Sequence, residues 1–310
     1  GQVVLSGSER QPDVMADLVM EHGAFAGFRL ASARLQAVVP VLGEAQSDVS
    51  LQINGLTSNA GLSLGDFSLS AKGVVGEHRL EWSLQGAPVT LAGALAGGLD
   101  RATSDWNGLL RQGQATLWGT PWNLKAVVPL SWHRDSGEFR LAAHCWNSEP
   151  ASLCATEPLL LGPAGRVAMS LRDFNTESLA AFMPEGLSWL GSLAGDLTAD
   201  WQPGQPAVAQ AHLHSGSGEF RLARDEALPL SLRYDQFSLA IDAGAAAVNA
   251  VATLAPTDLG AARLDATVNP FLDGKPVTGE VALSGMRLEL LQPFFPALSQ
   301  LSGLVSAEGR

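Results

Sequence analysis

"PWNLKAVVPLSW", residues 121–132, is the stretch that decides the fold. Every second residue from Trp122 gives Trp, Leu, Ala, Val, Leu and Trp, whereas the positions between them hold Pro, Asn, Lys, Val, Pro and Ser. This period-two alternation predicts a β-strand with one strongly apolar face and one mixed face. The fold depends on what the apolar face packs against.

The same alternation runs through most of the chain. In HRLEWSLQG (78–86), two leucines and Trp82 share one face. In LSLRYDQFSLAI (230–241), the apolar phase shifts by one residue after Tyr234, as it does at a turn or β-bulge. Clusters of Gly, Pro, Asn, Asp and Ser separate about twenty candidate strands. The sequence therefore predicts an all-β protein.

The composition and the motifs of the chain exclude several classes of function. The 310 residues carry a net charge of −12, and only 16% of them are charged. This balance lacks the basic footprint of nucleic-acid binding, so we expect no nucleic-acid partner. No apolar run reaches the roughly 18 residues that a transmembrane helix needs. The chain also lacks the G-x-S-x-G and H-E-x-x-H motifs, and the HLH histidines 212 and 214 have no further ligands nearby. We expect no enzyme, no cofactor and no metal site.

The two cysteines, Cys145 and Cys154, flank the turn-forming residues NSEPAS. Two short strands on either side of such a turn would bring the sulfurs together, which favours a disulfide over two free buried thiols. A bridge across so short a loop contributes roughly 2–3 kcal/mol to stability. It would also place the protein in an oxidising compartment.

Two segments depart from the period-two pattern. Residues 173–195, including Leu187, and residues 287–303 carry apolar side chains at helical spacing. Asn175 or Thr176 is the expected N-cap of the first segment. The two segments are similar to one another, so we expect short helices at the boundaries of an internal repeat.

Residues 11–25 and 205–220 also correspond, which extends the repeat. We expect three parts: a first β repeat that starts mid-repeat (1–172), a boundary helix with a second β repeat (173–285), and a boundary helix with the truncated start of the next repeat (286–310). We therefore expect the chain to be a central fragment of a longer repetitive protein.

Repeats of this kind favour an open array over a closed domain. We expect an elongated, curled β-sheet, a U-shaped trough whose concave face is apolar and whose outer face is polar. Such an apolar surface exceeds what soluble monomers normally expose and calls for a long apolar ligand. A two-layer β-sandwich with an ordinary core would show the same alternation and remains an alternative.

Several motifs resemble the TamB family of translocation and assembly module components. They are Trp-Asn-Gly-Leu at 106–109, Trp-Asn-Leu at 122–124 and the paired cysteines, within the similar region 104–154. The stretches 76–86 and 172–201 are also similar to that family. These motifs are degenerate, and the resemblance rests on their order.

The resemblance implies an AsmA-like, bridge-like lipid transfer protein with a taco-shaped apolar trough. It implies a periplasmic location, in a parent protein that is anchored in the inner membrane and reaches the outer membrane. Phospholipid acyl chains are the implied ligand. The outer-membrane barrel protein TamA is the implied partner, through parts of the protein outside this fragment.

The candidate groove residues are apolar positions of the predicted strands that share one face. They are Leu80, Trp82, Leu84, Leu117, Trp122, Leu124, Val128, Leu130, Trp132, Phe139, Leu141, Leu232, Phe237 and Leu239. Trp106 and Trp118 fall out of phase with this set, which indicates the convex side or a rim. In an ordinary core the same side chains would simply be buried.

Two hypotheses from different classes follow. In the first, the chain is a segment of a periplasmic conduit that carries phospholipid between the two membranes and is linked with outer-membrane protein assembly. In the second, it is a chaperone scaffold that receives nascent outer-membrane β-strands by β-augmentation. Lipid binding depends on the apolar face, whereas strand addition depends on free backbone groups at a sheet edge.

Overall fold

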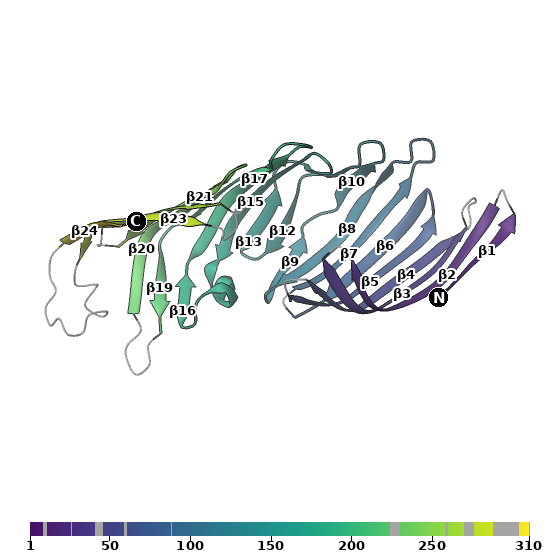
Figure 1. The fold of residues 1–310 in the computed structure, drawn as a ribbon, viewed down its shortest axis with the longest axis horizontal. Helices are drawn as coiled ribbons and strands as arrows, with labels where there is room; N and C mark the ends of the chain where they lie inside the picture. The colour runs from purple at the N-terminus through teal and green to yellow at the C-terminus, as the bar shows by residue number, and fades with distance from the viewer. Residues whose placement is uncertain are drawn as a thin grey trace. The chain divides into compact units, whose positions relative to one another are not determined.

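The computed structural model describes the chain except residues 9–10, 26, 41–45, 59–60, 88, 224–229, 258–259, 270–275, 288–303 and 310. All 24 strands within the described residues belong to one antiparallel sheet, which confirms the all-β prediction (Figure 1). The chain divides into two compact units. Unit 1 comprises Gly1–Ser148 with Leu160–Gly162, and unit 2 comprises Glu149–Leu159 with Pro163–Arg310.

Unit 1 is a succession of antiparallel strands, in which β2 to β8 each pair with the strand before and the strand after them. Its strands are β1 (Gln2–Ser8), β2 (Gln11–Phe25), β3 (Phe28–Pro40), β4 (Ser47–Ser58), β5 (Ser63–Val74), β6 (Glu77–Gln85), β7 (Val89–Leu99), β8 (Trp106–Leu117), β9 (Thr120–Leu124), β10 (Val128–His133), β11 (Glu138–Leu141) and β12 (His144–Ser148).

Unit 2 continues the antiparallel pattern and adds one short helix. Its elements are β13 (Ala151–Ala155), β15 (Gly165–Asn175), the 3₁₀ helix η1 (Thr176–Phe182), β16 (Leu187–Leu190), β17 (Ser192–Trp201), β18 (Val208–Ser215), β19 (Gly218–Leu222), β20 (Leu230–Ala243), β21 (Val248–Pro256), β22 (Ala261–Val268), β23 (Val277–Arg287) and β24 (Leu304–Gly309). The three-residue strand β14 (Leu159–Leu161) lies where the two units divide.

Strand register keeps apolar residues opposite apolar residues. In unit 1, one cross-strand row joins Leu18, Leu35, Leu51, Leu69 and Trp82. We call the side of the sheet that carries this row the apolar face of unit 1, and the other side its hydrophilic face. Because side chains alternate along a strand, a slip of one residue would turn every leucine of a strand to the hydrophilic side.

Unit 2 has a matching row, which runs through Leu171, Leu213, Leu239 and Leu264. We call the side that carries it the apolar face of unit 2. In this row, Gly195 lies between Leu171 and Leu213, and an alanine lies between Leu239 and Leu264. In both units, therefore, the register places uncharged residues opposite one another along the apolar face.

Irregular positions reset the alternation within several long strands, among them β8 and β20. In β8 the register shifts at Arg111, since Ala94 pairs with Gln112 whereas Leu95 pairs with Leu110. In β20 it shifts after Tyr234, as the sequence indicated. An extra residue in one strand moves later side chains to the other face. The apolar residues before and after the shift occupy positions of opposite parity in the sequence, and the extra residue places both groups on the same face.

The first predicted boundary helix is present but shorter than expected. Helix η1 is capped by Asn175, whose side chain accepts a hydrogen bond from the backbone N–H of Glu177 at 2.9 Å. Its C-cap is Met183, immediately before Pro184, because the residue before a proline disfavours helical backbone. Leu187, expected on the helix, instead begins strand β16. The second predicted helix, 287–303, lies almost entirely outside the described residues.

A buried cluster in unit 2 surrounds the chain's single tyrosine. Tyr234 is 1% exposed and packs with Trp189 and Leu193. The indole N–H of Trp189 donates to the Tyr234 hydroxyl at 2.6 Å, and that hydroxyl lies 2.9 Å from Oγ of Ser215. A Cβ on Gly218 would lie 2.2 Å from the same hydroxyl, so the glycine makes room for the ring.

We predict that Tyr234→Phe destabilises the protein by about 1–3 kcal/mol, because it leaves the buried Trp189 N–H without its acceptor. Thermal unfolding should show a fall of several degrees in Tm. Gln236→Ala, on the same strand but exposed, serves as the control and should leave Tm unchanged. An unchanged Tm in Tyr234→Phe would contradict the assigned hydrogen bond.

Candidate functional site

All eleven candidate groove residues in unit 1 lie on its apolar face. Register places Leu80 and Trp82 beside Leu95 and Gly93 of β7, and Val128 beside Leu110 of β8. The eleven are Leu80, Trp82, Leu84, Leu117, Trp122, Leu124, Val128, Leu130, Trp132, Phe139 and Leu141. The structure therefore brings together on one surface residues that are up to 61 positions apart (80 to 141) in the sequence.

The three candidates in unit 2 lie on the apolar face of that unit. Leu239 pairs with Leu213, Phe237 with Leu254, and Leu232 with Phe220. Phe237 also packs against the Trp189 cluster, and its ring meets the Trp189 ring edge-on at 5.2 Å between centroids.

Sequence reasoning counted Trp106 out of phase with the apolar set and missed several other residues. Trp106, expected on the convex side or a rim, lies at a rim of the sheet but on its apolar face, where it pairs with Leu99 and Trp132. The shift at Arg111 explains the error, because a count of alternate positions across a bulge assigns the wrong face. Trp118 lies in the turn after β8 with a φ of 47° and is exposed. The further members of the apolar face that the sequence did not single out include Leu95, Leu110, Trp146, Trp189, Leu213 and Phe220.

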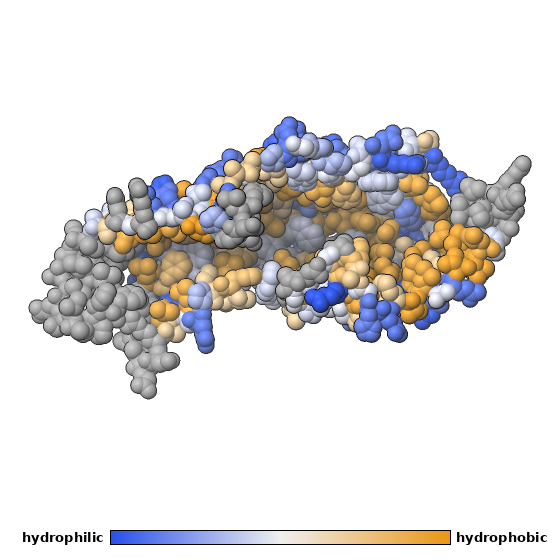
Figure 2. Space-filling model, viewed as in Figure 1, coloured by the Kyte–Doolittle hydropathy of each residue, from blue (hydrophilic) through white to orange (hydrophobic). Residues whose placement is uncertain are grey.

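The apolar face is only partly covered. Leu110, Val128 and Leu130 form a buried cluster, and Trp122 is also buried. Trp132 remains 38% exposed, and the other candidates are half-buried. Among the described residues, the exposed large hydrophobic side chains outnumber the buried apolar ones. Figure 2 shows apolar residues gathered on the hollowed side of each unit. An ordinary sandwich would bury them between two sheets, whereas the described strands form one sheet.

Tryptophans of the apolar face lie over glycines of neighbouring strands. A Cβ on Gly93 would lie 2.1 Å from Cζ2 of Trp82, and one on Gly113 would lie 2.5 Å from Cη2 of Trp146. Any residue larger than glycine at these two positions would push the indole away from the sheet. The glycines therefore keep the indoles low and leave free space above them.

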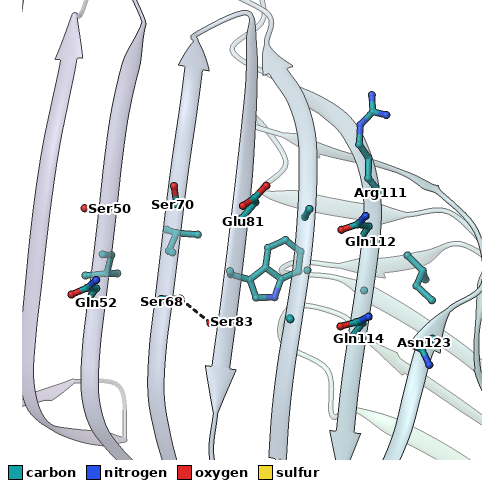
Figure 3. A pocket seen from close by; sticks show the side chains of 18 residues that line it. Ser50, Gln52, Ser68, Ser70, Glu81, Ser83, Arg111, Gln112, Gln114 and Asn123 are labelled. Carbon is teal, nitrogen blue, oxygen red and sulfur yellow. Dashed lines mark hydrogen bonds between the residues drawn. The ribbon is translucent and has the colours of Figure 1, made fainter.

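The hydrophilic face of unit 1 carries different chemistry. A hollow of about 750 Å³ crosses β4 to β9, and Figure 3 shows the serine, glutamine and asparagine side chains that form part of its lining, together with Glu81 and Arg111. Ser68 and Ser83 face each other there, with 2.8 Å between their hydroxyl oxygens. These groups bind water well and hydrocarbon poorly.

Ion pairs between strand residues also lie on the hydrophilic faces. In unit 1, Asp17 pairs with Arg34 at 2.8 Å, and the hydrogen bond from Arg34 holds the pKa of Asp17 below its usual value. In unit 2, hydrogen bonds from Arg221 and Ser231 lower the pKa of Glu219 to about 2. Neither of these two ion pairs places a charge on an apolar face.

The described residues contain no cluster of three or more His, Cys, Asp or Glu side chains able to hold a metal ion. Nor do they include a helix with the length and hydropathy that a membrane crossing needs. Cys145 and Cys154 are both disulfide-bonded. The arrangement can shelter hydrocarbon along the apolar faces.

Comparison with known proteins identifies relatives. The family model described as "TamB, N-terminal domain" matches residues 1–310. The translocation and assembly module subunit TamB of Haemophilus influenzae is 23% identical over 180 residues, which cover 57% of this chain and 14% of that protein. The match thus spans only a small part of the relative's length. No solved structure matches the chain.

We predict that Gly93→Val displaces the Trp82 indole and lowers Tm by several degrees, because the new Cβ overlaps the ring. The matched control is Ala92→Val, the neighbouring residue of β7, which adds similar bulk on the hydrophilic face. The Tm values of the two variants, measured by thermal unfolding, compare the effect of added side-chain bulk on the two faces. Equal Tm values would show that Trp82 is not held against Gly93.

Proposed function

The chain belongs to the TamB N-terminal domain family, and from that premise we propose that it is a segment of a periplasmic bridge-like protein that carries phospholipid. The acyl chains lie against the apolar faces. The parent protein connects the inner and outer membranes, and its function is linked with outer-membrane protein assembly.

The observation that carries the proposal is an apolar face that no second layer of described strands covers. In unit 1, a cross-strand row joins Ala37, Val49, Ala71, Leu80 and Leu95 without a charged residue. The row continues through Leu110 to Val128. Apolar patches larger than a few hundred Å² mark binding surfaces in soluble proteins. A ligand that matches a long apolar row is itself long and apolar.

Movement along the face follows from its uniformity. Each methylene removed from water contributes about 0.8 kcal/mol, whichever leucine or valine it touches. Binding is therefore similar at successive positions, and a chain that slides from one strand to the next meets low barriers. The head group, which is costly to bury, stays in water at the open side of the face.

The disulfide-bonded cysteines support a periplasmic location, because disulfides persist in oxidising compartments. The name of the Haemophilus influenzae relative supports a place in a translocation and assembly module. We propose that the barrel partner TamA is contacted by parts of the parent protein outside this chain, and that the parent protein is anchored in the inner membrane.

The direct test is mass spectrometry of organic extracts from the purified chain, with a mock purification as the control. The proposal expects phospholipid in near-stoichiometric amount. A folded chain free of lipid would overturn it and favour the alternative, a scaffold that receives nascent β-strands by β-augmentation.

We predict that Leu124→Asp and Leu232→Asp each lower the lipid recovered with the chain at least fivefold, because a carboxylate on the apolar face expels hydrocarbon. Both leucines are half-buried rather than fully buried, so we expect the fold to be retained. In the parent protein, the same changes should block lipid transport between the membranes.

Asn123→Asp is the matched control, since it adds the same charge one residue away on the hydrophilic face. Its lipid content should equal that of the unaltered chain. Circular dichroism checks that all three variants remain folded. Equal lipid content in folded Leu124→Asp and Asn123→Asp would contradict the assignment of the apolar face as the lipid-binding surface.

A further inference from the structure

Two apolar pockets lie side by side on the apolar face of unit 1. One has a volume of about 420 Å³ and includes Leu80, Leu130 and Phe139 in its lining. The other has a volume of about 300 Å³ and includes Val49 and Ala71. Both volumes fall within the size range of small-ligand sites, roughly 300–1,000 Å³.

The two pockets share three lining residues, His78, Leu99 and Trp106. These three come from adjacent strands β6, β7 and β8. A residue that lines both pockets lies between them. Trp106, the largest of the three, is therefore the main part of a ridge that separates one pocket from the other.

Trp106 is held in place from below and from the side. A Cβ on Gly97 or Gly108 would lie 2.5 or 2.4 Å from its ring, so the indole rests directly on these glycines. Its Nε1–H donates to Nε2 of His78 at 2.7 Å. Nδ1 of His78 lies 3.2 Å from the carbonyl oxygen of Val74, and it donates to this oxygen in the tautomer that accepts from Trp106.

The ridge lies at one rim of the sheet. Val74 and Leu99 end strands β5 and β7, whereas His78 and Trp106 lie at the starts of β6 and β8. Both pockets are therefore reached from the same line of turns, where a polar group stays in water. A molecule whose polar part rests at this rim can extend hydrocarbon to either side of Trp106.

We propose that Trp106, positioned by His78, divides the apolar face into two acyl-chain slots and so adapts it to lipids with two hydrocarbon chains. This inference rests on the proposed function, because it names the lipid class that the face takes. A two-chain lipid places one chain in each pocket and covers both apolar linings. A single-chain lipid fills one pocket and leaves the other exposed to water.

The test uses a phosphatidylethanolamine that carries a diazirine near the end of each acyl chain, and its single-chain lyso counterpart. Each is added to the intact chain at less than one lipid per protein, irradiated and digested with trypsin. Cleavage after Arg34, Lys72, Lys125 and Arg134 separates peptide 35–72, from the smaller pocket, and peptide 126–134, from the larger.

For the unaltered chain we expect one two-chain lipid to join peptides 35–72 and 126–134, whereas the lyso lipid modifies either peptide alone. Two-chain lipid found with both chains on the same peptide would overturn the division into slots while leaving lipid binding intact. The absence of cross-linked lipid anywhere on the chain would instead overturn the proposed function itself.

Trp106→Ala removes the ridge, so the two chains no longer need to separate, and the yield of joined peptides should fall at least fivefold. Trp118→Ala is the matched control, because Trp118 lies exposed in the turn after β8 and lines neither pocket. Its yield should stay within twofold of the unaltered chain. Equal losses in the two variants would overturn the role assigned to Trp106.

Discussion

The structure depends on cross-strand register. An antiparallel sheet places each side chain opposite one on the next strand, and in unit 1 this pairing carries an apolar row from Leu18 to Trp82. Since the side-chain period is two, an error of one residue in any strand would interrupt the row and expose its leucines on the wrong side. The bulges in β8 and β20 meet the same constraint. In each strand the apolar residues change from odd to even positions or the reverse, and the extra residue returns them to the apolar face.

A second constraint is the free space over the apolar face of the sheet. Tryptophan is the bulkiest side chain, and an indole that stood upright would obstruct the apolar face. Trp82 and Trp146 avoid this because each lies over glycine on the sheet. Glycine weakens a strand, since it has no side chain to pack, and the indole above it supplies the missing apolar contact. This arrangement stabilises the strand and keeps the face low.

The two faces of the sheet differ in polarity and charge. Ion pairs between strand residues, such as Asp17–Arg34, lie on the hydrophilic face. Because water screens these pairs, their contribution to stability is small. The apolar face gains stability from burial but is not fully buried, as the 38% exposure of Trp132 shows. Hydrocarbon that covers this partly exposed apolar surface removes it from water, which lowers the free energy further. This is the physical basis of the lipid proposal.

The sequence by itself determined the all-β class, the turns and the face that most apolar residues share. Trp122 and Leu124 could be assigned to one face because alternation is a property of the local backbone. Only the tertiary structure decided that Trp106 joins that face, that His78 accepts its hydrogen bond, and that glycines lie beneath the indoles. Those relations depend on hydrogen bonds between strands and on an extra residue at Arg111, and periodicity within one strand carries no information about either.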